Sequence, residues 1–219
     1  MGEVSAIVFD FGGPVLLTPF ELLRAAERRL GLAAGRLDWR GPFDPDADPL
    51  WQRLQGGLIT ERQYWTERAV ELDRITRVGA DLQDLFTVLF EAEPSELVRP
   101  QADSLLAAAG AAGIATAVLT NDLARFHPPA WIARIGFLSR VGTIVDGSVT
   151  GLLKPDPGAY RLVLDALRMP PQRVLFVDDQ LQNIDGADRV GLHTLWFDVT
   201  DPVESYRRLR ELAGLPAAG

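Results

Sequence analysis

The sequence contains no cysteine, which excludes a disulfide framework and a zinc site built from thiolates. It has no apolar run of about 18 residues, the length that a helix needs to cross a bilayer. Its first residues lack the basic start and the small-residue cleavage site of a secretory signal peptide. We therefore expect a cytoplasmic protein that has no membrane partner.

Positive charge is scarce as well. The net charge is −8, and no basic stripe runs along the chain, so we expect no nucleic-acid partner. Lys154 is the only lysine among 22 lysine and arginine residues. An ammonium and a guanidinium bind phosphate differently, so the single lysine marks a position where a compact ammonium can matter. Whether the protein is a monomer or a homodimer stays open.

The N-terminal part of the sequence begins with a strand pattern and continues with helical patterns. The stretch "SAIVFDFGGPVL", residues 5–16, reads as a buried strand that ends at a glycine pair. Residues 17–97 carry helical patterns and no strand signal, with a proline- and aspartate-rich loop at 41–49. Thr18 is a plausible helix N-cap, and Thr60 with Gln63 forms a capping-box pattern. We therefore predict a helical insert, with helices near 18–30, 58–73 and 80–91.

Strands and helices alternate after Pro100. The helical segments are 101–112, 123–135, 157–168, 181–190 and 202–212, and the strand segments are "IATAVLT", "TIVDG", "RVLFVDD" and "HTLWF". This alternation is typical of a parallel sheet with helices on both faces. The predicted fold is α/β: a doubly wound, Rossmann-like core of residues 1–16 and 98–219, and a helical cap of residues 17–97.

Polar side chains follow three of the predicted strands. Asp10 ends the first strand, Thr120 ends a second, and Asp178 with Asp179 ends a third. Sites in such sheets lie at the carboxyl ends of the strands. Converging carboxylates repel unless a cation holds them, and ligands that are all oxygen favour Mg²⁺. Lys154 adds an ammonium, and this set suits a phosphate that Asp10 could attack.

Four stretches in order resemble the motifs of the haloacid dehalogenase-like hydrolase superfamily. They are "VFDFGG" around Asp10, "VLTND" around Thr120, "KPDPGAY" from Lys154, and "VLFVDDQLQNIDGA" around Asp178. The segment "LWQRLQGGLITERQYW" resembles the small helical cap of the phosphatase-like branch. The resemblance covers nearly the whole core.

The resemblance implies roles for seven residues. Asp10 would be the nucleophile, and Mg²⁺ would be held by Asp10, the backbone carbonyl of Gly12, Asp178 and Asp179. Thr120 and the Asn121 amide would hold the phosphoryl group together with Gly12, and Lys154 would neutralise its charge. The implied substrate is a small phosphorylated molecule, such as a sugar phosphate, whose identity the sequence does not give.

One residue departs from the family pattern. Phosphatases of the superfamily usually carry a second aspartate at the position of Gly12, which protonates the leaving group. Three functions stay open: a phosphatase that lacks this acid, a catalytically weak phosphate-binding or regulatory protein, and a metal-independent 2-haloacid dehalogenase. The paired Asp178 and Asp179 argue against the dehalogenase. His127 is a candidate replacement for the missing acid.

Overall fold

A parallel sheet forms the centre of the larger of two compact units. The computed structural model describes residues 3–217. The five strands of this sheet lie in the order β3–β2–β1–β4–β5, and every neighbouring pair is parallel. All carboxyl ends therefore lie along one edge. The strand bounds are β1 Ala6–Phe9, β2 Ala115–Thr120, β3 Thr143–Asp146, β4 Val174–Asp178 and β5 His193–Trp196.

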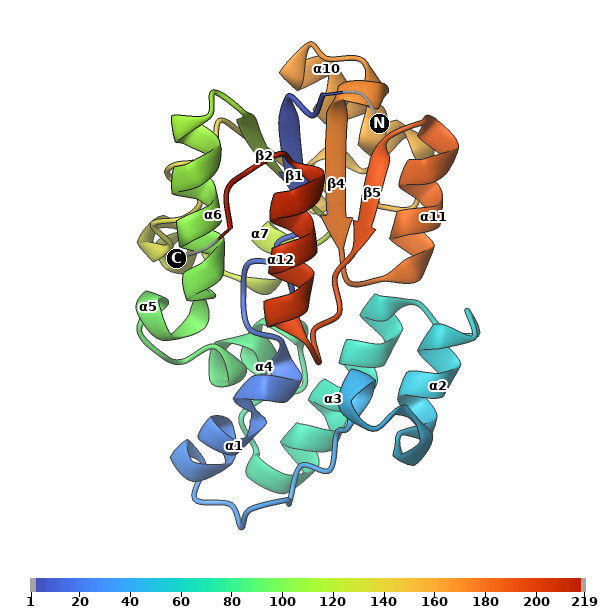
Figure 1. Ribbon diagram of the computed structural model, residues 1–219. Coiled ribbons are helices and arrows are strands. Elements are labelled where there is room, and N and C mark those ends of the chain that lie inside the picture. The colour runs from blue at the N-terminus through green and yellow to red at the C-terminus, as the bar shows by residue number, and fades with distance from the viewer. Residues whose placement is uncertain (1–2, 218–219) are drawn as a thin grey trace. The chain divides into compact units, whose positions relative to one another are not determined.

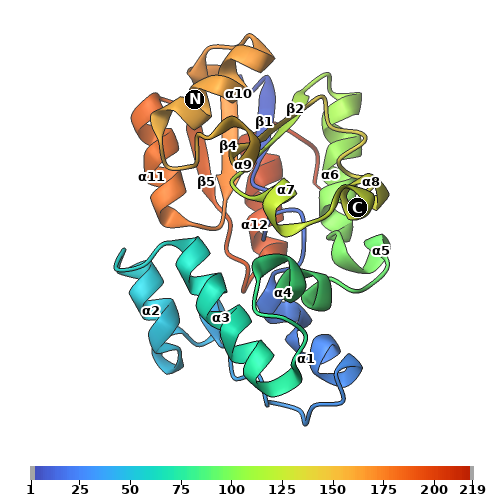
Figure 2. The same cartoon turned by 180° about the vertical axis from the view of Figure 1, so that it is seen from behind.

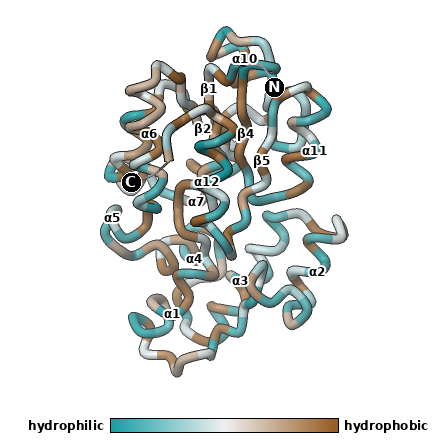
Figure 3. Tube along the Cα trace, in the orientation of Figure 1, coloured by the Kyte–Doolittle hydropathy of each residue, from teal (hydrophilic) through white to brown (hydrophobic). Residues whose placement is uncertain are grey.

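Helices cover both faces of this sheet (Figures 1 and 2). Helices α6 (Pro100–Ala111) and α12 (Pro202–Leu212) lie on one face, where Arg210 of α12 donates a hydrogen bond to Ser104 of α6. Helices α10 (Pro157–Leu167) and α11 (Leu181–Val190) cover the other face and pack on Val8 and Phe176. The central strands are apolar along their length (Figure 3), as buried parallel strands are. The predicted doubly wound α/β fold is confirmed.

Shorter helices connect these elements. They are α5 (Pro94–Leu97), α7 (Leu123–Phe126), α8 (Pro129–Arg134), α9 (Gly147–Thr150) and the 3-10 turn η3 (Pro171–Arg173). The prediction of one continuous helix over 123–135 is wrong. Pro128 and Pro129 interrupt it, because the residue before a proline avoids the helical region and proline lacks an amide hydrogen.

The smaller unit is helical. It comprises Thr18–Ala92 and, from further along the chain, Arg125–Pro128. The expected capping box of Thr60 with Gln63 is present, and the expected N-cap Thr18 also forms a capping box with Glu21. Residues 93–97, which we expected in the cap, group with the sheet unit. The elements of the helical unit are α1 (Pro19–Arg29), η1 (Gly41–Phe43), η2 (Pro45–Ala47), α2 (Pro49–Gln55), α3 (Glu61–Thr76) and α4 (Leu82–Leu89).

Aromatic side chains form the core of the helical unit. The Trp65 ring packs against Phe20, Tyr64 and Phe86, with centroids 4.8–5.5 Å apart. Tyr64 and Trp65 are buried, so both act in packing and neither offers a free ring to a ligand. None of the helices in residues 3–217 is long and apolar enough to span a membrane.

His127 belongs to this aromatic core. Its ring lies edge-on to Phe86 and Phe90, at centroid distances of 5.8 and 5.1 Å. Burial disfavours the imidazolium and lowers the pKa of His127 from 6.5 to about 3. A ring that is neutral at pH 7 carries no imidazolium proton to donate, so the geometry does not support His127 as a general acid.

We expect His127 to make folding stability depend on pH. Its pKa is lower in the folded state than in the unfolded state, so the unfolded chain binds the extra proton first as the pH falls. This contribution to stability is complete above pH 6.5 and is lost toward pH 3, at up to about 1.4 kcal/mol per pH unit. Urea unfolding between pH 6.5 and 5 should show this slope, and His127→Leu should flatten it. Equal slopes in the two proteins would contradict the prediction.

Candidate active site

Three carboxylates meet at the carboxyl edge of the sheet. Asp10 directly follows β1, Asp178 ends β4, and Asp179 is the next residue. One oxygen from each lies within 4.8 Å of the others. Asp178 is fully buried and Asp10 is 8% exposed. Carboxylates this close repel one another unless positive charge balances them.

Lys154 supplies positive charge to this group. Its Nζ donates hydrogen bonds to Asp10 Oδ1 and to Asp178 Oδ2, both at 2.6 Å. Burial alone would lower the pKa of this ammonium, but the Asp10 and Asp178 carboxylates outweigh burial and raise its pKa above the ordinary value. The chain's single lysine is therefore a buried, permanently charged counter-ion to two carboxylates.

Asp178 is held in place by further donors. Its Oδ1 accepts the backbone N–H of Gln180 at 2.8 Å, and Asn183 Nδ2 lies 3.1 Å from each carboxylate oxygen. The hydroxyl of Tyr160 donates to the Asn183 carbonyl at 2.7 Å. We did not assign Asn183 to the site from the sequence, although it is the asparagine of the "VDDQLQN" stretch. Its place one turn into α11 brings it back toward Asp178.

The second motif contributes two residues with different surroundings. The Asn121 side chain pairs with the peptide of Lys154: its Oδ1 accepts the Lys154 N–H at 2.7 Å and its Nδ2 donates to the Lys154 carbonyl at 3.2 Å. Asn121 therefore positions Lys154 with its side chain, which leaves its backbone amide for the predicted phosphate contact. Thr120 ends β2, and its hydroxyl has no partner within residues 3–217.

The two glycines after Asp10 differ in what they require. Gly13 has a φ of +80°, and a Cβ there would lie 2.9 Å from Asp179 Cγ, so a side chain would collide with that carboxylate. Gly12 has no such constraint. A Cβ there would lie 3.7 Å from Asp10 Oδ2, an ordinary contact, and its φ lies outside the left-handed region. The backbone would therefore accept an aspartate at Gly12.

The loop that carries these glycines is braced from distant parts of the chain. Buried Arg99 donates from its Nε to the Gly13 carbonyl at 2.6 Å and from its backbone N–H to the Val15 carbonyl at 2.8 Å. The Tyr206 hydroxyl donates to the Pro14 carbonyl. These bonds fix the backbone next to Gly12, whose carbonyl is a predicted metal ligand. The sequence did not single out Arg99 or Tyr206.

Known proteins resemble this chain over most of its length. It is 32% identical to protein CbbY of Cereibacter sphaeroides over 88% of this chain and 83% of that protein. It is 27% identical to phosphatase MT3486 of Mycobacterium tuberculosis over 90% and 88% of the two chains. Its identity to (S)-2-haloacid dehalogenase 1 of a Pseudomonas species is 26%, over 99% and 96%. It matches acyl-CoA dehydrogenase family member 10 of Mus musculus at 26% identity over 96% of this chain, but spans only 19% of that protein.

A solved structure shares the fold of this chain, and a family model matches its sequence. The fold resembles the magnesium-bound structure of the putative hydrolase YfnB from Bacillus subtilis, with a TM-score of 0.66 and 19% identity over 90% of this chain and 88% of that one. A model of the haloacid dehalogenase-like hydrolases matches residues 4–191. With its parallel sheet and its carboxylates at the strand ends, the chain belongs to the haloacid dehalogenase-like hydrolases and is an enzyme of that family.

Proposed function

We propose that the protein is an Mg²⁺-dependent phosphatase that hydrolyses small phosphate monoesters through an aspartyl-phosphate on Asp10. The observation that carries this proposal is the Lys154 ammonium, which bridges Asp10 and Asp178 at 2.6 Å each. Lys154 contacts Asp10 through Oδ1, so we assign the attack to Oδ2, and the ammonium supplies the positive charge that a transferring phosphoryl group needs.

The donor set fits a hard divalent cation. Three carboxylates within 4.8 Å offer only oxygen, which Mg²⁺ prefers to nitrogen or sulfur ligands. Asp10, Asp178 and the Gly12 carbonyl would hold the ion, with Asp179 assisting. When bound, the ion would draw negative charge from the phosphoryl oxygens and orient them for attack.

The residues of this chain then divide the reaction between them. Asp10 Oδ2 attacks phosphorus as the bond to the leaving oxygen breaks, while Thr120 and the Asn121 amide hold the phosphoryl oxygens. The leaving alkoxide or aryloxide takes its proton from water, because Gly12 has no acid to offer. Water then attacks the phosphorus of the aspartyl-phosphate, which releases phosphate and restores Asp10.

The names of several relatives support this class of substrate. One of them, phosphatase MT3486, matches the chain over 90% of its length. The alternative function, a 2-haloacid dehalogenase, is disfavoured because attack on carbon by Asp10 needs neither Asp178 nor Asp179. A protein that only binds phosphate would not require the ordered Asp10–Lys154 contact, although it would tolerate it.

Metal removal tests the proposal. Purified protein should hydrolyse a chromogenic aryl phosphate in the presence of Mg²⁺, because an aryloxide is a good leaving group that needs little acid catalysis. Excess chelator should lower the rate at least about 100-fold, and added Mg²⁺ should restore it. Turnover of 2-chloropropionate in chelator would support the dehalogenase instead. Full activity on the aryl phosphate in chelator would refute the metal-dependent mechanism.

A further inference from the structure

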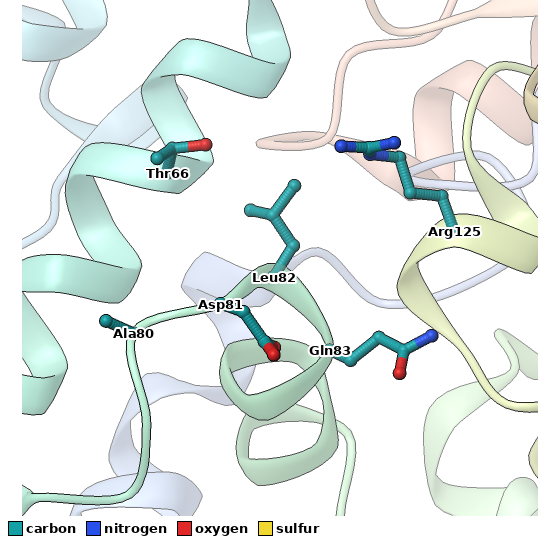
Figure 4. Close-up of a pocket in the computed structure, with 6 residues that line it drawn as sticks. All are labelled: Thr66, Ala80, Asp81, Leu82, Gln83 and Arg125. Atoms are coloured by element: carbon teal, nitrogen blue, oxygen red, sulfur yellow. The ribbon is translucent and has the colours of Figure 1, made fainter.

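The polar side chains at the pocket of the helical unit are not fixed in one direction. This pocket has a volume of about 490 Å³, and Gln83 and Arg125 are among its lining residues (Figure 4). Both side chains are exposed and have no hydrogen-bond or ion-pair partner within residues 3–217. A side chain positions another group only when its own direction is fixed, and that condition is met instead at the carboxyl edge of the sheet.

Trp196 lies at this edge as the last residue of β5. Its register partner is Asp178, the last residue of β4. Although Trp196 is 44% exposed, its indole N–H donates a hydrogen bond to the Asp179 carbonyl at 2.9 Å. This bond fixes the indole ring against the turn between β4 and α11. The turn carries two of the three carboxylates of the candidate site.

The peptide between Asp179 and Gln180 is bound at both of its ends. Its carbonyl accepts the Trp196 indole N–H, and its own N–H donates to Asp178 Oδ1 at 2.8 Å. The preceding peptide is fixed as well, because the Asp178 carbonyl accepts the Phe197 N–H at 2.9 Å. A residue has only two soft backbone dihedrals, so fixing both flanking peptides fixes the backbone of Asp179.

Gly13 limits the Asp179 side chain from another direction. A Cβ at Gly13 would lie 2.9 Å from Asp179 Cγ, so the Asp179 carboxyl occupies the space that a side chain at position 13 would take. One oxygen of Asp179 lies within 4.8 Å of oxygens of Asp10 and Asp178. With its backbone fixed and this side closed, the Asp179 carboxylate has few ways to turn away from the other two.

We propose that Trp196 is a positioning residue of the metal site, which directs the Asp179 carboxylate toward the ion through its hydrogen bond to the Asp179 carbonyl. This inference rests on the proposed Mg²⁺-dependent function and adds to its site a residue outside the four motifs. The indole N–H is only a donor, so Trp196 cannot itself be a metal ligand. Its effect on the ion passes through Asp179.

Trp196→Phe removes the N–H donor and keeps an aromatic ring at this edge. We expect the variant to bind Mg²⁺ about 10-fold more weakly, as is typical when a group that orients a metal ligand is lost. The dissociation constant of Mg²⁺ is measured without substrate, by displacement of Mn²⁺, whose free ion gives an electron paramagnetic resonance signal. Unchanged Mg²⁺ affinity in a folded Trp196→Phe protein would overturn the inference.

Trp131→Phe is the matched control for this variant. Trp131 is the other tryptophan of the sheet unit and lies in α8. Its replacement by phenylalanine removes an indole N–H from the same unit, and Mg²⁺ should bind as tightly as in wild type. An equal loss of Mg²⁺ affinity in Trp131→Phe and Trp196→Phe would overturn the specific role of Trp196.

A double-mutant cycle separates positioning of Asp179 from a general effect on the fold. Asp179→Asn removes the carboxylate that Trp196 directs. In that background, Trp196→Phe should cost little further Mg²⁺ affinity, because two residues that act through one group are not additive. A loss by the same factor in both backgrounds would show that Trp196 does not act through Asp179.

Binding without turnover also separates this inference from the phosphatase proposal. If Trp196→Phe weakens Mg²⁺ binding through Asp179 while wild type hydrolyses no phosphate ester, the positioning role stands and the phosphatase proposal fails. If wild type hydrolyses an aryl phosphate with Mg²⁺ and Trp196→Phe binds the ion as tightly as wild type, the positioning role is overturned and the phosphatase stands. Wild type that binds no Mg²⁺ would overturn both.

Discussion

Replacing Asp10 with asparagine is expected to lower kcat for phosphate-ester hydrolysis at least about 10³-fold, because an amide cannot attack phosphorus. The substitution keeps the size of the side chain. The asparagine Oδ1 can still accept the Lys154 ammonium, which also keeps its contact with Asp178 at 2.6 Å. The loss should therefore appear as lost turnover in a folded protein, with the far-ultraviolet circular dichroism unchanged.

The matched control for this variant removes a carboxylate of the same unit outside the site. Asp165 is exposed on α10, and Asp165→Asn should keep wild-type kcat and KM. Rapid-quench experiments with ³²P-labelled substrate should trap a phosphorylated protein in wild type and not in Asp10→Asn. An Asp10→Asn protein that retains full activity would show that another group attacks.

Gly12→Asp is expected to increase the rate on esters with poor leaving groups by about 10²- to 10⁴-fold, the usual contribution of a general acid. A Cβ at Gly12 makes an ordinary 3.7 Å contact with Asp10 Oδ2, so the new carboxyl enters without backbone strain. The rate on nitrophenyl phosphate should change little, because that leaving group departs without a proton. The measurement is kcat for alkyl and aryl phosphates on the same preparation.

Gly12→Asn distinguishes acid catalysis from added bulk. It matches aspartate in size and transfers no proton, so it should gain no rate on alkyl phosphates. Should Gly12→Asn accelerate alkyl esters as much as Gly12→Asp does, the missing acid would not be what limits the enzyme. Gly13 cannot serve in this comparison, because any side chain there would collide with Asp179.

The sequence predicted the sheet and the position of the acidic residues for physical reasons. Buried parallel strands are uniformly apolar, and parallel order sends every strand end to one edge, which brings Asp10 beside Asp178. The spacing of Thr18 and Thr60 to their capping partners is local, so both helix starts were predictable. We predicted one continuous helix over 123–135, although the break at Pro128 could have been predicted too, since proline acts on its immediate neighbours.

Contacts between residues far apart in the chain could not be predicted from the sequence. Arg99 lies 86 positions from Gly13, whose carbonyl it contacts, and no local sequence pattern predicts this hydrogen bond. The same holds for Tyr206 and Pro14. The sequence predicted that Asn121 belongs to the site. It did not predict that the Asn121 side chain points toward the Lys154 peptide. Such details depend on packing that only the folded chain defines.

The segment Arg125–Pro128 limits how far the helical unit can be treated as an exchangeable module. Phe126 stacks on Phe86 with ring centroids 4.1 Å apart, and His127 covers Phe90 beside it. A fragment cut at residues 18 and 92 would lack both rings and expose Phe86 and Phe90 to water. Swapping that fragment between related proteins would therefore transplant an incomplete core. A graft that keeps the core intact must also include Arg125–Pro128, the four residues after the second motif that belong to the helical unit.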